Sequence, residues 1–203
     1  MPVTEIAQFR YKAGNPSATE SILLQQAQQA QSEYSNHPAH LLRQVEDSSY
    51  GYILGGWESV AVHTEDWIRS ETNQKVMAGL QDGIDVEWMF HLDIDPSTSS
   101  APFKAPVVSI TRCFVEPSKK AGFENFLKAG LPQLAGYEAL VAYAGGWRID
   151  KEGEDEEYVL FGGWSKVEDH LGFAGSEASS EFSKIRDFVK GAEAKHMVVE
   201  KWQ

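Results

Sequence analysis

The sequence predicts an α+β protein made of two tandem copies of one β-α-β-β-α-β unit. The first observation behind this prediction is an internal repeat, in which Tyr52–Trp57 (YILGGW) recurs as Tyr158–Trp164 (YVLFGGW). The second is that strand-like and helix-like hydrophobic patterns follow in the same order on both sides of Asp95–Pro106. That stretch has no periodicity and holds three prolines and three serines, which is typical of a linker. The predicted domains are repeat 1, the linker and repeat 2, at residues 1–95, 96–106 and 107–203.

The repeat continues beyond the two Gly-Gly-Trp strings. His63 matches His170 at an offset of 107 residues, and after one apparent deletion Trp67 matches Phe173 at an offset of 106. A chance recurrence of Gly-Gly-Trp would not carry the later histidine and aromatic residue in the same order. We therefore interpret the match as a true duplication.

Periodicity places six elements in repeat 1. Ser17 and Glu20 form a capping box, which marks the start of a helix. Near the end of the repeat, apolar Trp88 and Phe90 alternate with His91 and its polar neighbours, as in a strand with one buried face and one face in solvent. The expected elements are a strand at Val3–Tyr11, a helix from Ser17 to about Tyr34, strands at Leu41–Glu46 and Gly51–Trp57, a helical region at about Val60–Leu80 and a strand at Val86–Asp93.

Repeat 2 shows the same order of patterns, with an acidic turn, Glu152–Glu157, between its two central strands. The expected elements are a strand at Val107–Val115, a helix marked by Phe123, Phe126 and Leu127, strands at Leu140–Ile149 and Glu157–Trp164, a helical stretch to about Lys190 and a strand at His196–Trp202. Both repeats therefore correspond to the ferredoxin-like, or split βαβ, unit.

Composition excludes several classes of protein. The formal net charge of −12 argues against a nucleic-acid binder and against docking on an anionic membrane, since both need clustered basic residues. With 42% hydrophobic residues the chain can build a core, and its one cysteine, Cys113, cannot form an internal disulfide. No secretory signal and no apolar run long enough to span a membrane are visible, so we expect a cytoplasmic protein.

The chain resembles the dimeric α+β barrel superfamily. The resemblance rests on the order of elements in each half, on Trp57-x-Ser59 at the end of the third strand and on Trp67-x-x-Ser70-Glu71 in the next helix. Within the superfamily it is similar to the antibiotic-biosynthesis-monooxygenase-like (ABM) family, in the tandem-repeat form of fungal proteins. The resemblance implies two repeats packed sheet to sheet as an α+β barrel, and an activity such as cofactor-independent oxygenation or polyketide cyclisation.

Haem-degrading members of the family use an asparagine on the first strand, a tryptophan in the helical region and a histidine about ten residues later. In repeat 1 the tryptophan corresponds to Trp67, but the other two positions fall near Gln8 and on Met77. The corresponding residues of repeat 2 are Arg112, Phe173 and Ser183. Only one of these six positions agrees, so the resemblance does not favour haem degradation.

The candidate site residues fall into two groups. His63 and His91 are the candidate catalytic residues, because an imidazole moves protons near neutral pH. The candidate ligand-binding residues are Trp57, Trp67, Arg112, Trp164 and His170. The alternative interpretations are structural: tryptophans anchor cores, histidines that recur in both repeats can hydrogen-bond a neighbouring loop, and His91 can lie on a solvated strand face. No HExxH string and no cysteine pair is present, so we expect neither a metal nor another cofactor.

Two hypotheses for function remain open at this point. The first is an enzyme-like protein that binds a small apolar or aromatic compound, as a cofactor-independent monooxygenase or cyclase of secondary metabolism. The second is a non-catalytic, ligand-binding or stress-associated protein. Any catalytic cleft is expected in repeat 1, near Trp67 and His91, and the chain could form a homo-oligomer.

Overall fold

The computed structural model describes residues 1–200 and divides them into two compact units. The first unit comprises Met1–Ser100 together with residues 198–200, and the second comprises Ala101–Met197. The C-terminal residues belong to the first unit because the backbone N–H of Glu200 donates to the carbonyl oxygen of Leu41, at 2.8 Å. No helix within residues 1–200 is long and apolar enough to cross a membrane.

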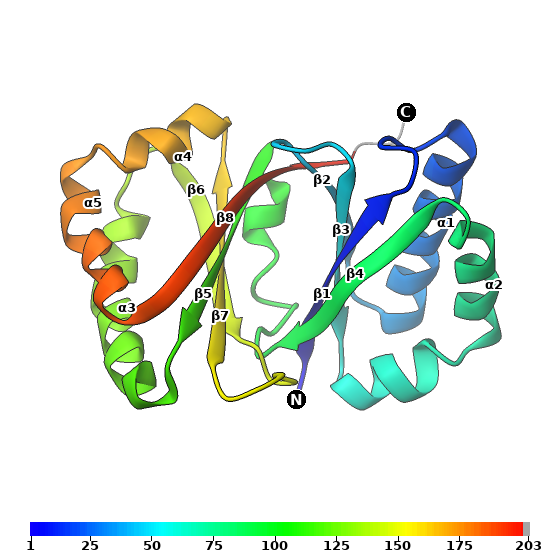
Figure 1. Cartoon of the computed structure of the whole chain (residues 1–203), viewed down its shortest axis with the longest axis horizontal. Helices are drawn as coiled ribbons and strands as arrows, with labels where there is room; N and C mark the ends of the chain where they lie inside the picture. Colours follow the sequence, from blue (N-terminus) through cyan, green and yellow to red (C-terminus); the bar gives the residue numbers. More distant parts are fainter. Residues whose placement is uncertain (201–203) are drawn as a thin grey trace. The chain divides into compact units, whose positions relative to one another are not determined.

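The first unit is a four-stranded antiparallel sheet with two helices on one face (Figure 1). Its elements are β1 (Val3–Tyr11), α1 (Ala18–Ser35), β2 (Ala39–Gln44), β3 (Tyr50–Trp57), the short helix η1 (Val62–Trp67), α2 (Glu71–Leu80) and β4 (Ile84–Leu92). The strand order is β4-β1-β3-β2, which is the order of a split βαβ unit. The predicted sequence of elements in repeat 1 is therefore confirmed.

Local sequence explains both ends of α1. The Ser17 hydroxyl accepts from the backbone N–H of Glu20 at 3.2 Å, and the Glu20 carboxylate accepts from the backbone N–H of Ser17 at 2.5 Å. This is the predicted capping box. At the other end Asn36 adopts a left-handed conformation (φ 57°), which ends the helix and turns the chain into β2.

A bulge in β4 changes which of its side chains share a face. The pairing of β4 with β1 shifts at Gln8 and Phe9, so that Gln8 lies opposite Trp88 and Phe9 opposite Val86. Strict alternation along the whole predicted strand was therefore wrong. Met89 lies opposite Ala7 on the helix-covered face, which places Trp88 on the other face of the sheet.

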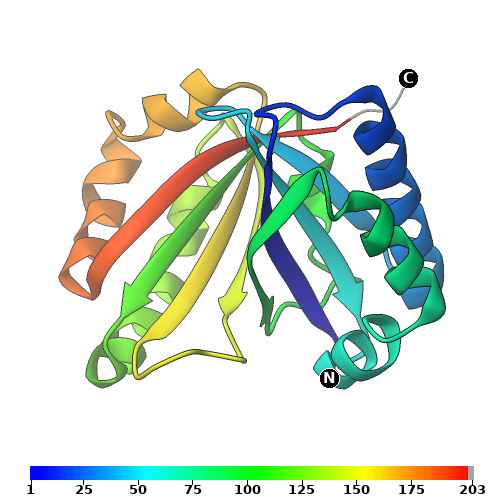
Figure 2. The same ribbon diagram turned by 45° about the vertical axis from the view of Figure 1, so that its right-hand side comes forward.

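The second unit has the same architecture, again with its helices against one face of the sheet (Figure 2). Its strand order is β8-β5-β7-β6, and β7 pairs antiparallel with both β5 and β6. The elements are η2 (Ala101–Lys104), β5 (Val107–Val115), η3 (Pro117–Lys119), α3 (Lys120–Ala135), β6 (Leu140–Trp147), β7 (Glu156–Trp164), α4 (Val167–Phe173), α5 (Glu177–Phe182), η4 (Ser183–Asp187) and β8 (Val189–Val199).

The α+β class and the two ferredoxin-like repeats are confirmed, and two details differ from the sequence prediction. The last strand begins at Val189 rather than at His196, and the predicted residues 201 and 202 lie outside the described part of the chain. The predicted linker contains η2, in which Phe103 is buried and packs edge-on against Phe161 at 5.2 Å. The packing of the two repeats sheet to sheet stays a prediction.

Candidate functional site

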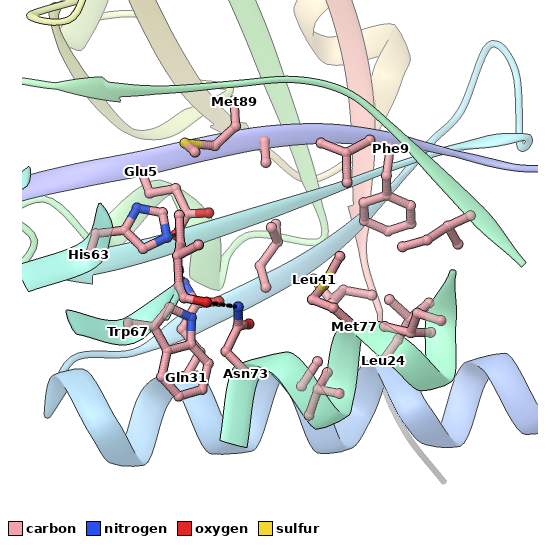
Figure 3. Close-up of a pocket in the computed structure, with 18 of the residues that line it drawn as sticks. Glu5, Phe9, Leu24, Gln31, Leu41, His63, Trp67, Asn73, Met77 and Met89 are labelled. Atoms are coloured by element: carbon pink, nitrogen blue, oxygen red, sulfur yellow. Dashed lines mark hydrogen bonds and ion pairs between the residues drawn. The ribbon is translucent and has the colours of Figure 1, made fainter. Parts of the chain in front are cut away.

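A cavity of about 270 Å³ lies in the first unit, between the sheet and helices α1 and α2. Figure 3 shows that its two ends differ in character. Polar or amphipathic side chains line one end: Glu5, Gln31, His63, Trp67 and Asn73. Aliphatic, aromatic and methionine side chains line the other, among them Phe9, Leu24, Leu41 and Met77. The cavity therefore suits a compound with an apolar body and one polar group.

The cavity opens between α2 and β4. A second hollow of about 400 Å³ shares Met77, Ile84 and Val86 with the cavity lining. Met77 and Val86 are exposed to solvent. A compound entering there would reach the apolar end first and would place its leading group at the polar end.

Glu5 is the ionisable group at the centre of the polar end. Side chains alternate along β1, so Glu5 shares the helix-covered face with Ala7 and Phe9, and it is 5% exposed. Its Oε2 accepts two hydrogen bonds, from the indole N–H of Trp57 at 2.9 Å and from the amide of Gln31 at 2.8 Å.

Gly55 makes room for this arrangement. A Cβ atom at residue 55 would lie 1.9 Å from Nε2 of Gln31, so any other residue there would displace the Gln31 amide from its place beside Glu5. The glycine in the repeated Gly-Gly-Trp string thus allows the close approach of a helix side chain.

Two buried histidines extend the polar cluster behind Glu5. Nε2 of His63 lies 3.4 Å from Oε2 of Glu5, and Nδ1 of His63 lies 2.7 Å from Nε2 of His91. The Trp57 ring stacks on the His63 ring, with centroids 4.4 Å apart. Which histidine nitrogen carries each proton depends on the tautomers, and the three side chains form one row from Glu5 through His63 to His91.

The solvated-face alternative for His91 was wrong. His91 is 0% exposed, because it lies opposite Glu5 in the β1–β4 pairing and on the face that the helices cover.

Burial raises the pKa of Glu5 from 4.5 to about 7. The hydrogen bond from Trp57, the charge of His91 and the hydrogen bond from Gln31 act in the opposite direction, but desolvation of the carboxylate outweighs them. No lysine or arginine within residues 1–200 forms an ion pair with this carboxylate. A carboxyl group that titrates near neutral pH can both accept and return a proton under physiological conditions.

The second unit repeats the histidine cluster without the carboxylate. Nδ1 of His170 lies 2.8 Å from Nε2 of His196, and the Trp164 ring stacks on His170 at 4.7 Å. The Trp164 indole N–H donates to the hydroxyl of Ser109 at 2.9 Å, so a serine takes the place of Glu5. Burial and the neighbouring His196 lower the pKa of His170 to about 4.

His91 and His196 are therefore equivalent, although the sequence comparison did not align them. The two histidines of the first pair are 28 residues apart and those of the second pair are 26 apart, which conceals the match.

Gln31 also has no polar counterpart in the second unit. Tyr34 packs against Trp67 at 5.1 Å, and Tyr137 packs against Phe173 at the same distance. Since Gln31 precedes Tyr34 by three residues, its equivalent is Leu134, which is buried in an apolar cluster. The first unit thus differs from the second by a carboxylate and a carboxamide that face its cavity.

The one-residue shift in the repeat corresponds to a π-helical turn. In η1 the backbone N–H of Ile68 donates to the carbonyl oxygen of His63, five residues earlier, at 2.9 Å. The equivalent segment of the second unit, α4, is an ordinary α-helix. The additional residue between His63 and Trp67 is accommodated by the wider turn, which occurs frequently at functional sites.

The structure brings four of the predicted residues together and separates the others. Trp57, His63, Trp67 and His91 form one cluster, in which His63 and Trp67 line the cavity while Trp57 and His91 lie behind it. Trp164 and His170 form the corresponding cluster of the second unit.

Arg112 joins neither cluster. Its guanidinium pairs with Glu157 and, at 3.7 Å, with Glu193, and it lies over the Phe114 ring. Within residues 1–200 no group of three or more His, Cys, Asp or Glu side chains is arranged to hold a metal ion.

Sequence reasoning missed Glu5, Gln31 and Asn73. One signal for Glu5 was available, because alternation along the strand places its side chain on the same face as those of Val3, Ala7 and Phe9. A carboxylate on the apolar face of a strand is rare enough to indicate a function. Gln31 and Asn73 lie on helices that carry many other polar residues, so they could not be singled out in this way.

Comparison with known proteins supports the fold alone. Neither a known protein family nor a curated protein matches the sequence. Among solved structures, a proposed monooxygenase from Fusobacterium nucleatum is 11% identical, with 98% of this chain and 93% of that chain covered and a TM-score of 0.70. An anthrone oxidase-like protein is 12% identical, with 98% and 92% covered and a TM-score of 0.70. A mutant chlorite dismutase from Candidatus Nitrospira defluvii is 7% identical, with 98% and 92% covered and a TM-score of 0.61. The chain shares the fold of these proteins over nearly its whole length.

Proposed function

We propose that the first unit binds a small, largely apolar compound in its cavity and that Glu5 takes a proton from it. The observation that carries this proposal is a buried carboxylate at the polar end of an otherwise apolar cavity, with its pKa raised to about 7. A general base of this kind is matched to proton transfer at neutral pH. The reaction class is cofactor-independent oxygenation or cyclisation of an aromatic or polyketide-like metabolite.

The chemistry begins with an acidic O–H or C–H group of the compound beside Oε1 of Glu5. Transfer of that proton leaves an electron-rich anion in a largely apolar cavity. In a monooxygenase such an anion can reduce dioxygen to a substrate peroxide, which loses water to leave a carbonyl group, so that the substrate supplies both electrons. In a cyclase the anion attacks a carbonyl carbon of the same molecule, and the resulting alkoxide takes the proton back. His63 and His91 would take the proton onward from Glu5 and return it when the product is protonated.

Several differences between the units support activity in the first. Ser109 and Leu134, which replace Glu5 and Gln31, can neither accept a proton at neutral pH nor orient a carboxylate. Repeat 1 also has a tryptophan, Trp67, where repeat 2 has Phe173. The second unit keeps the stacked tryptophan and the histidine pair, with Ser109 in the place of the carboxylate.

One observation favours the alternative of a non-catalytic ligand-binding protein. The histidine pair and its stacked tryptophan occur in both units, with nearly equal distances of 2.7 and 2.8 Å between the paired nitrogens. A feature that is kept where the carboxylate is missing can serve packing rather than catalysis. Under this alternative Glu5 only fixes the ligand's polar group.

Identification of copurifying compounds, followed by turnover measurements, separates these possibilities. Mass spectrometry of the protein as purified from its native source should identify a small, largely apolar compound. Glu5→Gln should abolish its conversion while its binding is retained. His91→Ala should reduce conversion much more than His196→Ala, with both variants folded by circular dichroism. Binding without conversion in the wild-type protein, or equal effects of the two histidine variants, would favour the non-catalytic alternative.

A further inference from the structure

The polar end of the cavity has a distinctive balance of hydrogen-bonding groups. We infer that the compound bound there carries a neutral headgroup with two neighbouring hydroxyl groups, as in a catechol, attached to an apolar body. This inference rests on the proposed function, and it names the class of compound that the site selects.

The carboxamides of Gln31 and Asn73 both line the cavity. The amide nitrogen of Gln31 donates to Glu5, and that of Asn73 donates to the carbonyl oxygen of Ile68 at 3.1 Å. These bonds fix the orientation of both amides, because the nitrogen atoms must face the protein acceptors. The two carboxamide oxygens accept no hydrogen bond from any residue within 1–200.

The two carboxylate oxygens of Glu5 also differ in their partners. The contacts with Trp57, Gln31 and His63 all fall on Oε2, and Oε1 has no hydrogen-bond donor within the described chain. Glu5 and Gln31 are each only 5% exposed. No side-chain nitrogen or oxygen in residues 1–200 is both fully enclosed and without a partner. The unused oxygens must therefore reach open space, and the space that both residues line is the cavity.

One donor stands among these acceptors. The indole N–H of Trp67 makes no hydrogen bond within residues 1–200, and Trp67 lines the same end of the cavity (Figure 3). Glu5, Gln31 and Trp67 therefore offer one carboxyl oxygen, one carboxamide oxygen and one N–H at the polar end. A well-matched headgroup must donate at least twice and accept once.

Comparison of simple headgroups selects hydroxyl groups. A carboxylate or a fully ionised phosphate would face the oxygens of Glu5 and Gln31 with no proton to offer. An ammonium group would donate to these two oxygens but could not accept from Trp67. Hydroxyl groups both donate and accept, so a pair of them can satisfy the acceptors of Glu5 and Gln31 and the donor of Trp67 at once. A buried polar group left without its partner weakens binding, which makes the choice selective.

The rest of the cavity requires the body of the compound to be apolar. Beyond the polar end the lining contains Phe9, Leu24, Leu41 and Leu80, and the opening is bordered by Met77 and Val86. A compact alkyl group opposite the two hydroxyls would fill this space.

Calorimetric titration with a matched series of compounds tests the inference. The series is 4-tert-butylcatechol, its dimethyl ether, 4-tert-butylbenzylamine and 4-tert-butylbenzoate, titrated under nitrogen to prevent oxidation. We expect the catechol to bind best, and the dimethyl ether and the benzoate to bind at least about tenfold more weakly, because each leaves buried acceptors without donors. Gln31→Leu should reduce the preference for the catechol over its ether severalfold, whereas Gln29→Leu, on an exposed position of the same helix, should not.

The possible results test the headgroup assignment and the binding site separately. If the ether or the amine binds as tightly as the catechol, the headgroup assignment is wrong while the cavity remains a binding site. If the compounds bind with the expected order but none is converted by the protein in the presence of dioxygen, the headgroup assignment holds and catalysis is not supported. If none of the four binds saturably, both the headgroup assignment and the proposed binding function are overturned.

Discussion

Replacement of Glu5 by glutamine isolates the energetic cost of burying its carboxylate. The pKa of Glu5 is about 7 in the folded protein and 4.5 at its ordinary value, which we take for the unfolded chain. Between these two pH values the folded protein binds more protons than the unfolded chain, so the free energy of unfolding falls as the pH rises. Below pH 4.5 the carboxyl group is protonated in both states, and above pH 7 it is ionised in both.

The size of the stability change follows from the pKa shift of Glu5. Each unit of pKa difference corresponds to about 1.4 kcal/mol, so Glu5 should lower the stability of the wild-type protein by about 3 kcal/mol between pH 4.5 and pH 7. Glu5→Gln removes this dependence, because an amide does not titrate. Its oxygen can still accept from Trp57 and Gln31, and its nitrogen replaces the oxygen that faces the cavity. Relative to the wild type, the variant should therefore gain about 3 kcal/mol over this pH range.

Urea denaturation of both proteins at half-unit steps from pH 4.5 to 8.5 measures this gain. Glu157→Gln is the matched control, since Glu157 is also 5% exposed but pairs with Arg112 and Arg148. Loss of that carboxylate removes a buried ion-pair partner of Arg112 and Arg148 and should destabilise the protein at neutral pH, by about 3 kcal/mol. A stability difference between Glu5→Gln and wild type that stays constant within about 1 kcal/mol from pH 4.5 to 8.5 would refute the desolvation argument.

Three further predictions concern the cavity. Gln31→Leu removes a donor that lowers the pKa of Glu5, so the midpoint of turnover against pH should move above 7, and an unchanged midpoint would contradict the role of this amide. Trp67→Phe, which copies the second repeat, should weaken ligand binding several-fold in fluorescence titrations, while Phe173→Trp should leave it unchanged; equal effects would end the assignment of the site to the first unit. Haem titration should give no Soret band that saturates at one haem per chain, because Met77 stands where haem-degrading members of the resembled family have a histidine.

The fold of each half was predictable because its signals are local. The capping box at Ser17 and Glu20 is contained in four residues and defines the start of α1 in the structure. The repeated Gly-Gly-Trp string and the one-residue change of offset after His63 could both be read from the sequence. That change of offset corresponds to the π-helical turn, although the sequence alone could not show which structure accommodates the additional residue.

The arrangement of the site was less predictable, because it depends on how strands pair. The bulge opposite Phe9 places Val86 in the cavity lining and Trp88 on the other face of the sheet, although strict alternation put both on one face. His91 faces the helices for a related reason, since its position opposite Glu5 is a property of the pairing rather than of its neighbours in sequence.

What the sequence determined by itself was therefore the class of fold, the duplication, and the difference in aromatic side chains between the repeats. Only the tertiary structure placed Glu5, Gln31 and Asn73, from a strand and two helices, around one cavity and joined His63 to His91. The physical reason is that periodicity depends on neighbouring residues, whereas the desolvation that raises the pKa of Glu5 depends on side chains far along the chain. In the sequence a glutamate that will be buried cannot be told from an exposed one, because its pKa is set by the side chains that surround it in the folded protein.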